Sequence, residues 1–306
     1  MSHGDARPLD VLPFDHRGSF LADLFGLHEP LSPAQAAQVR AAKGVIYQGF
    51  LQAVASGGVP RAAAALLVDE EFGAEILADA RARGLITACP VEKSGQEEFD
   101  FEYGADFAAH IEAVDPTFVK ALVRYNPDGD PALNARQTER LRRLGAFLTG
   151  AGRPFMFELL IPAEPAQLSA VGGDHGRYDR ELRPGLTVRA VEALQDAGVE
   201  PDVWKVEGLD TPADARRLVA AARRDGRDAV GCIVLGRGAD AAQVEGWLRI
   251  AAGVPGFTGF AVGRSTFEEP LRAWLAGQLD EAAAAGQIAA LYTHWARVFG
   301  EAKAGA

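Results

Sequence analysis

The chain contains 306 residues, of which 48% are hydrophobic and 24% charged, as is typical of a soluble protein with a large core. Its formal net charge of −11 argues against nucleic acid or an anionic membrane surface as a partner. A phosphate-bearing substrate would therefore need a local positive pocket within a negative protein.

The sequence shows no pattern of export or membrane insertion. Residues 1–7 are polar and lack the apolar region of a signal peptide. There is no run of about 18 apolar residues, so no transmembrane helix is expected. Cys89 and Cys232 each lie in an apolar run, which predicts reduced core thiols rather than a disulfide framework. These features predict a cytoplasmic protein and leave open whether it forms a homo-oligomer.

Short apolar runs alternate with alanine-rich helical patterns along the whole chain. The expected strands are 9–14, 62–68, 85–91, 118–125, 154–161, 201–208, 229–235 and 257–262. The expected helices are 36–50 (after a Ser32-Pro33 start signal), 71–83, 107–114, 134–148, 185–197, 212–224, 241–252, 270–278 and 280–299. Residues 162–184 are rich in Gly, Asp and Arg, which predicts a mobile surface loop.

Eight strand–helix repeats without a break in composition predict one (β/α)8 TIM barrel domain over residues 1–306, with extra C-terminal helices. A doubly wound open sheet is the alternative, because periodicity does not show closure. Gly236-Arg237-Gly238 lacks the third glycine and the later acidic residue of a dinucleotide-binding fingerprint. A Rossmann fold is therefore not expected.

The strand around Lys205 places a lysine in the middle of a buried apolar run. Alternation puts Val203, Lys205 and Glu207 on one face of the strand, and Trp204 on the other. Burying an ammonium group is costly, and the usual resolution is a lowered pKa that leaves a neutral amine. Such an amine is a nucleophile toward carbonyl groups, which is Schiff-base chemistry. The alternative is a lysine that reaches solvent and pairs with Glu207.

Three further polar residues interrupt or end apolar strands: Asp15, Lys120 and Glu158. In a TIM barrel, side chains at the carboxyl ends of strands meet at one face, so the four residues predict an interior charged cluster. A second lysine would favour a neutral amine through like-charge repulsion, and the carboxylates could transfer protons.

The ends of the seventh and eighth strands are glycine-rich, which is where many barrels bind phosphate. Gly236, Gly263 and Arg264 are therefore candidate phosphate ligands, with simple turn chemistry as the alternative. Arg17 and Lys93, which follow the first and third strands, could contact an anion or could be surface charges.

A metal-dependent lyase is the rival hypothesis, because His16 ends a strand beside carboxylates. None of the six histidines has the spacing of a zinc motif, so neither a metal nor any other cofactor is expected.

Short motifs at residues 14–18, 68–73, 92–95, 204–207 and 262–265 fall in order at successive strand ends. They resemble the class I tagatose-1,6-bisphosphate aldolase family. The resemblance implies a Schiff base on Lys205, a catalytic Glu158, an active-site Lys120 and a phosphate site at Arg264. Where that family has glutamine after its first aspartate, this chain has His16, which becomes a candidate substrate contact.

The patterns beginning at Phe14, Pro201 and Gly259 are still more similar to the aldolase domain of some bacterial myo-inositol catabolism proteins. That resemblance implies cleavage of 2-deoxy-5-keto-gluconate 6-phosphate into dihydroxyacetone phosphate and malonate semialdehyde. The expected partner is thus a small sugar phosphate. A tagatose-1,6-bisphosphate-type aldolase, a metal-dependent lyase and a non-catalytic sugar-phosphate-binding barrel remain the alternatives.

Overall fold

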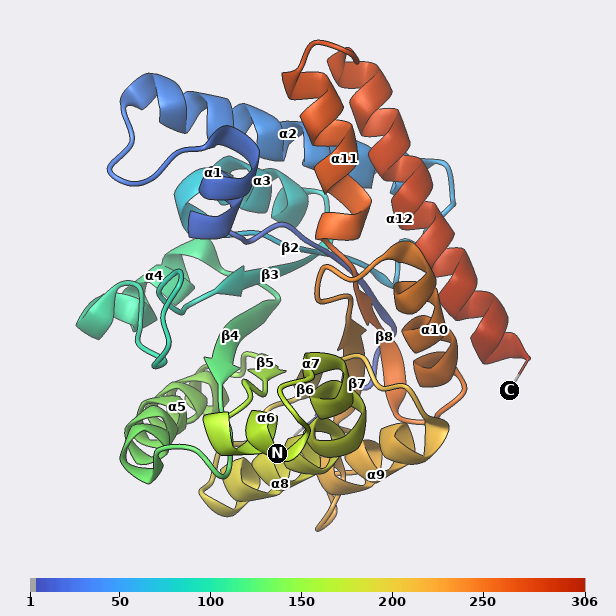
Figure 1. Cartoon of the computed structure of the whole chain (residues 1–306). Helices are drawn as coiled ribbons and strands as arrows, with labels where there is room; N and C mark the ends of the chain where they lie inside the picture. The colour runs from blue at the N-terminus through green and yellow to red at the C-terminus, as the bar shows by residue number, and fades with distance from the viewer. Residues whose placement is uncertain (1–3, 306) are drawn as a thin grey trace.

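The computed structural model describes residues 4–305, in which eight parallel strands form one closed barrel in sequence order (Figure 1). The strands are β1 (Leu9–Pro13), β2 (Ala64–Leu67), β3 (Ile86–Pro90), β4 (Phe118–Arg124), β5 (Phe155–Leu160), β6 (Val203–Glu207), β7 (Gly231–Leu235) and β8 (Phe257–Ala261). The barrel closes where β8 pairs with β1. The predicted (β/α)8 barrel is confirmed, and the open-sheet alternative is wrong.

Helices surround the barrel (Figure 1). They are α1 (Gly18–Phe25), α2 (Pro33–Ala55), α3 (Glu70–Ala82), α4 (Phe107–Val114), α5 (Pro131–Ala151), α6 (Pro165–Ala170), α7 (His175–Arg177), α8 (Arg183–Asp196), α9 (Pro212–Ala222), α10 (Ala241–Ala252), α11 (Arg264–Leu275) and α12 (Glu281–Ala304). A 3-10 turn, η1 (Gly104–Asp106), precedes α4, and a π-helical turn, η2 (Tyr178–Leu182), precedes α8. The long C-terminal helix α12 packs against α2, α10 and α11.

The alternation expected for the lysine strand is present. Val203 belongs to the apolar cluster inside the barrel, whereas Trp204 and Val206 belong to the larger cluster between the barrel and its helices. Both cysteines are buried free thiols, as expected. None of the helices in residues 4–305 combines the length and apolar character needed to cross a bilayer.

The predicted loop over residues 162–184 is wrong, because most of this segment is helical. Pro165 provides a helix start at α6, and the Asp174 side chain accepts a hydrogen bond from the Arg177 N–H at α7. The Tyr178 hydroxyl, which is buried, donates to the Ile161 carbonyl at 3.1 Å. The polar composition hides these local signals, and one buried aromatic side chain attaches the segment to the barrel.

Two helices near the site also differ from the sequence prediction. The short helix α1 was not expected; it buries Phe20 and Leu21 and ends at Gly26, whose φ is +63°. Helix α11 begins at Arg264 rather than at Pro270, which lies inside it. Proline usually marks a helix start, but here the packing of the buried Phe267 outweighs that preference. The earlier start places Arg264 in the first turn of α11.

Candidate active site

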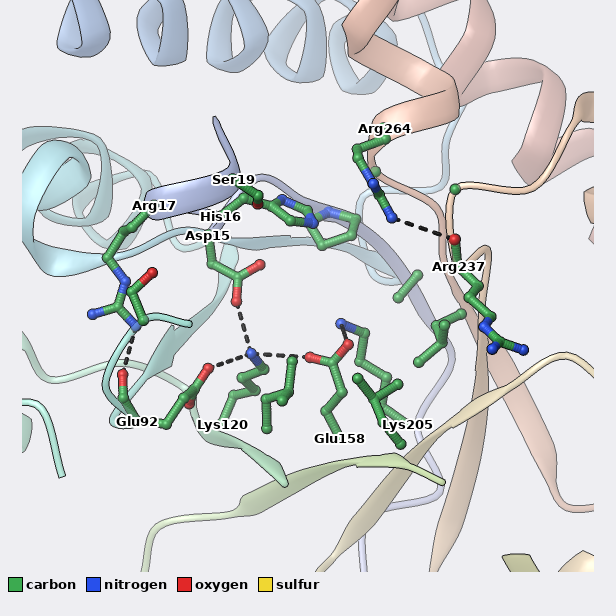
Figure 2. Close-up of a pocket in the computed structure, with 18 of the residues that line it drawn as sticks. Asp15, His16, Arg17, Ser19, Glu92, Lys120, Glu158, Lys205, Arg237 and Arg264 are labelled. Carbon is green, nitrogen blue, oxygen red and sulfur yellow. Dashed lines mark hydrogen bonds and ion pairs between the residues drawn. The ribbon is translucent and has the colours of Figure 1, made fainter. Parts of the chain in front are cut away.

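A cavity of about 350 Å³ opens at the carboxyl ends of the strands, and it is strongly cationic (Figure 2). Its lining includes seven basic residues, Arg17, Lys93, Lys120, Arg124, Lys205, Arg237 and Arg264. Only three lining residues are acidic, namely Asp15, Glu92 and Glu158. The protein of net charge −11 therefore contains the local positive pocket that an anionic substrate requires.

Lys120, on β4, lies at the centre of a buried charged cluster. Its Nζ is 2.8 Å from Asp15 Oδ2, 2.6 Å from Glu92 Oε1 and 2.9 Å from Glu158 Oε2. Burial works to lower the pKa of Lys120, but the three carboxylates outweigh it and raise the pKa well above its ordinary value. Lys120 is therefore an ammonium group at neutral pH.

Lys205, on β6, has a different environment. Among residues 4–305 its Nζ pairs with a single carboxylate, Glu158, at 2.7 Å from Oε1. Glu158 thus bridges the two lysines, one on each carboxylate oxygen (Figure 2). The sequence alternative, in which Lys205 pairs with Glu207, is wrong, because Glu207 pairs with Arg237 at 3.0 Å.

The strand register explains why these side chains meet. Glu158 and Lys205 are Cα partners across β5 and β6, so their side chains leave the sheet side by side. Lys120 is paired with Met156 and starts one layer deeper in the barrel. Its long side chain reaches up to the carboxylates of the layer above.

The carboxylates differ in their ionisation. Burial works to raise the pKa of Asp15, but Lys120 and Lys205 outweigh it and hold the pKa well below its ordinary value. The same balance of burial against the two ammonium groups lowers the pKa of Glu158. For Glu92, burial prevails over the opposing influence of Lys120 and raises the pKa. Lys120 and Lys205 thus favour the charged forms of Asp15 and Glu158, whereas burial disfavours the charged form of Glu92.

Glu92 is a cluster residue that the strand pattern does not single out. It follows β3 by two positions and falls in a polar stretch, so it does not interrupt an apolar run. The available signal was its place in the motif at 92–95. For finding Glu92 from the sequence, its position just after a strand end was therefore a better signal than the presence of a polar residue within an apolar strand.

His16, the residue after Asp15, lines the cavity beside Arg264 (Figure 2). Burial lowers the pKa of His16 to about 4, and Asp15 only partly opposes this. Its ring is accordingly neutral at neutral pH. The buried Nδ1 has no hydrogen-bond partner among the described residues.

The ends of β7 and β8 form the part of the cavity wall next to β1. Gly236, Gly263 and Arg264 all line it, as expected. Arg264 is exposed, and its Nη2 makes a long contact of 3.3 Å with the Arg237 carbonyl, which leaves most of the guanidinium free. The first turn of α11 lines the cavity through Arg264 and Ser265, and no side chain caps the start of this helix. Backbone N–H groups at an uncapped helix start can bind an anion.

Two of the candidate anion ligands are already engaged by protein groups. The buried guanidinium of Arg17 pairs with Glu102 at 2.6 Å and also donates to the Glu92 carbonyl. Lys93 lies on the rim, where its Nζ is 3.1 Å from Asp100. Arg17 thus joins the loops after β1 and β3, and Lys93 would have to leave its ion pair to bind an anion.

Within residues 4–305, no group of three or more His, Cys, Asp or Glu side chains is arranged to hold a metal ion. The three carboxylates that converge in the cavity surround the Lys120 ammonium group instead. His16 lies beside this cluster but does not complete a metal site.

Gly263 is required by a close backbone approach. A Cβ atom at this position would lie 2.3 Å from the Pro13 carbonyl oxygen, in the turn that leads into α11.

We expect Gly263→Ala to lower the free energy of unfolding by roughly 1–3 kcal/mol, since the β1 end must shift. Chemical denaturation measures this, with Gly145→Ala in α5 as the control. That site is open, so alanine there is expected to be neutral or stabilising. Equal stability of both variants would contradict the close approach.

A family model described as an uncharacterized protein conserved in bacteria (DUF2090) matches residues 2–303. The chain belongs to the DUF2090 family. Comparison with curated protein sequences finds no significant match.

Solved structures share the fold of this DUF2090 protein at low identity. An archaeal fructose 1,6-bisphosphate aldolase has a TM-score of 0.56 at 14% identity, over 94% of this chain and 95% of the other. Fructose-bisphosphate aldolase from Plasmodium falciparum has a TM-score of 0.62 at 14% identity, over 98% and 92%. A Schiff base forming fructose-1,6-bisphosphate aldolase has a TM-score of 0.54 at 13% identity, over 95% and 94%. These similarities show the fold.

Proposed function

We propose that this protein is a class I aldolase that cleaves a phosphorylated ketose or keto-deoxy sugar acid through a Schiff base on Lys205. The observation that carries the proposal is the unequal pairing of the two buried lysines. Lys120 contacts three carboxylates and stays charged, whereas Lys205 contacts only Glu158 among residues 4–305, which leaves its amine less engaged by the protein. Solved structures that share the fold include aldolases, one of them Schiff-base forming, which supports the same chemistry.

The first step is attack of the neutral Lys205 amine on the substrate ketone. Glu158, 2.7 Å from Nζ, takes up the ammonium proton and returns a proton to the carbinolamine hydroxyl, which leaves as water. The resulting iminium keeps a positive charge next to Glu158. The ion pair of the resting site is thereby preserved in the intermediate, so the charge balance of the buried cluster does not change.

The iminium then accepts the electron pair of the breaking carbon–carbon bond, and an aldehyde leaves while an enamine stays on Lys205. Asp15 and Lys120, which pair with each other at 2.8 Å, are assigned to the substrate atoms at this bond. As the bond breaks, the Glu158 carboxylate takes the proton of the substrate hydroxyl whose oxygen becomes the aldehyde, and this proton later passes to the enamine carbon. The ionised Asp15 orients that hydroxyl, and the Lys120 ammonium stabilises its oxygen. Protonation and hydrolysis of the enamine product free Lys205.

The substrate phosphate is assigned to Arg264 and the start of α11, which lie beyond His16 from Asp15 (Figure 2). His16, with its unpaired Nδ1, lies between the two regions and is proposed to contact a substrate hydroxyl. The favoured substrate is 2-deoxy-5-keto-gluconate 6-phosphate, as in myo-inositol catabolism, and the alternative is a tagatose-1,6-bisphosphate-type ketose.

Arg264→Ala is expected to weaken phosphorylated substrate binding by about 1.5–3 kcal/mol, or roughly 10- to 100-fold, because a charge-assisted contact is lost. The measurement compares adduct formation by a phosphorylated ketone with that by its unphosphorylated analogue. Only the phosphorylated compound should be affected. Equal losses for both compounds would identify Arg264 as a structural residue.

The proposed function is tested by borohydride reduction of the enzyme with a panel of sugar phosphates, followed by intact-mass measurement. Each panel member that forms a Schiff base adds a covalent mass, and cleavage is followed in parallel by aldehyde release. A metal-dependent lyase would give cleavage that a chelator abolishes and no covalent mass. A non-catalytic barrel would bind sugar phosphates but give neither product nor adduct.

A further inference from the structure

Lys43, in α2, is a fully buried lysine outside the cavity. Its Nζ donates to the Phe14 carbonyl at 2.9 Å and to the His16 carbonyl at 3.1 Å. The same Nζ forms an ion pair with the buried Asp69. An ammonium group has three N–H donors, and these three acceptors use all of them.

The two carbonyl acceptors flank Asp15 on either side. The Phe14 carbonyl belongs to the peptide group that precedes Asp15, and the His16 carbonyl belongs to the peptide group that joins His16 to Arg17. Lys43 therefore bonds to the residue on each side of Asp15 from outside the barrel. On the inside, the Asp15 carboxylate lies 2.8 Å from Lys120. The catalytic cluster and Lys43 therefore contact the same short turn from opposite sides.

Asp69 gives Lys43 a fixed partner. Its side chain accepts a hydrogen bond from the Phe72 N–H at 2.8 Å and caps the start of α3. Lys43 Nζ also lies over the rings of Phe20 and Phe72, at 5.2 and 5.7 Å from their centroids. These contacts hold the ammonium group in one place. They give a structural role to Asp69, the aspartate of the motif at residues 68–73.

A buried ion pair is by itself weak evidence for stability, because desolvation offsets much of the attraction. The Lys43–Asp69 pair also affects the backbone next to the cavity. Two of the three donors are directed to the backbone of a single turn, and that turn carries a residue of the charged cluster.

We propose that Lys43 is a positioning residue for the reaction, which acts through Asp15 by bonding to the backbone carbonyls of the residues on either side of it, Phe14 and His16. The inference rests on the proposed aldolase function. Arg17 and the hydrogen bond from the Gly18 N–H to Ser94 Oγ, at 3.0 Å, hold the next part of the loop but do not contact the carbonyls beside Asp15. The Phe14 N–H also donates to the Leu67 carbonyl at 2.8 Å, but among the described residues Lys43 is the side chain that bonds to the carbonyls of both residues beside Asp15.

The test is a double-mutant cycle with the neutral pair Lys43→Met/Asp69→Asn and Asp15→Asn. Methionine fills the space of the lysine stem, and asparagine keeps an acceptor for the Phe72 N–H. The pair change should lower kcat by about 10- to 100-fold, since a displacement of about 1 Å is costly, with KM changed less. In the Asp15→Asn background the same change should cost less than about threefold, because its target is already lost. Losses that multiply would overturn the inference.

Tyr47→Phe is the matched control. Tyr47 lies one turn further along α2, and its hydroxyl donates to Asp79 of α3 at 2.7 Å without touching the β1 turn. This variant tests loss of an α2–α3 contact alone, and it should keep wild-type kcat. A similar kcat loss in both variants would reduce Lys43 to a packing role.

A crystal structure of the Lys43→Met/Asp69→Asn variant gives a readout that does not need activity. The contact of 2.8 Å between Asp15 and Lys120 should lengthen or be lost. If that contact is unchanged, the positioning role is wrong even if the enzyme is an aldolase. If the wild type forms no adduct with any sugar phosphate yet the contact is lost in the variant, the proposed function fails while the structural dependence of Asp15 on Lys43 stands.

Discussion

Lys205→Arg is expected to abolish the borohydride-trapped adduct and to reduce carbon–carbon cleavage by on the order of 10⁴-fold or more. Arginine keeps a positive charge beside Glu158, but its guanidinium group stays protonated and cannot attack a ketone. The ion pair, and with it the fold, should be retained. Aldehyde release and intact-mass analysis after reduction measure the two effects.

The control for this loss is Arg264→Ala, which should still form an adduct with an unphosphorylated ketone. A Lys205→Arg enzyme that cleaves at more than a few per cent of the wild-type rate would contradict the Schiff base. If the Lys205→Arg variant forms a weak adduct at another lysine, the assignment of Lys205 as the nucleophile would be wrong, although the barrel fold would not be affected.

Lys120→Met is expected to be the most destabilising single change in the cavity. It removes the ammonium group that pairs with Asp15, Glu92 and Glu158, and leaves buried carboxylates without that partner. Breaking a buried pair from one side costs roughly 3–5 kcal/mol of unfolding free energy. Denaturant unfolding measures it, with Lys93→Met as control. Lys93 is half-exposed in its pair with Asp100, so its loss should cost no more than about 1 kcal/mol.

The pH dependence of Lys120→Met should be opposite to that of the wild type. In the wild type the depressed pKa values of Asp15 and Glu158 contribute stability above their ordinary values of 3.8 and 4.5, and this is lost only as the pH falls through the folded values. Without Lys120, burial raises the carboxylate pKa values, so protonation relieves the cost. The stability difference between variant and wild type should therefore shrink as the pH falls from neutral toward the ordinary carboxylate values of 3.8 and 4.5. A difference that does not change with pH would show that Lys120 contributes packing rather than charge.

The barrel and the positions of Asp15, Lys120, Glu158 and Lys205 were accessible from sequence because each signal is local. A polar residue inside an apolar strand is visible in a window of a few residues, and the carboxyl ends of parallel strands meet in a barrel. The contacts that decide the roles of the residues are not local. Whether Lys120 has one carboxylate or three depends on the register between β3, β4 and β5.

The same reasoning explains the residues that the pattern did not indicate. Lys43 lies in the middle of a helix, where a lysine usually faces solvent, and only the packing of α2 against the β1 turn buries it. The start of α11 at Arg264 was hidden by Pro270, although that start is what aims the helix end at the cavity. Tertiary packing outweighed local preference in both cases.

The most direct test of the central claim is to locate the adduct in the wild-type enzyme. After borohydride reduction with the substrate that gives the most cleavage, proteolysis and tandem mass spectrometry identify the modified lysine. The unequal pairing of the two buried lysines predicts that the modification is on Lys205. A modification on Lys120 or Lys93 would contradict that assignment, and cleavage without any lysine adduct would contradict the class I mechanism itself.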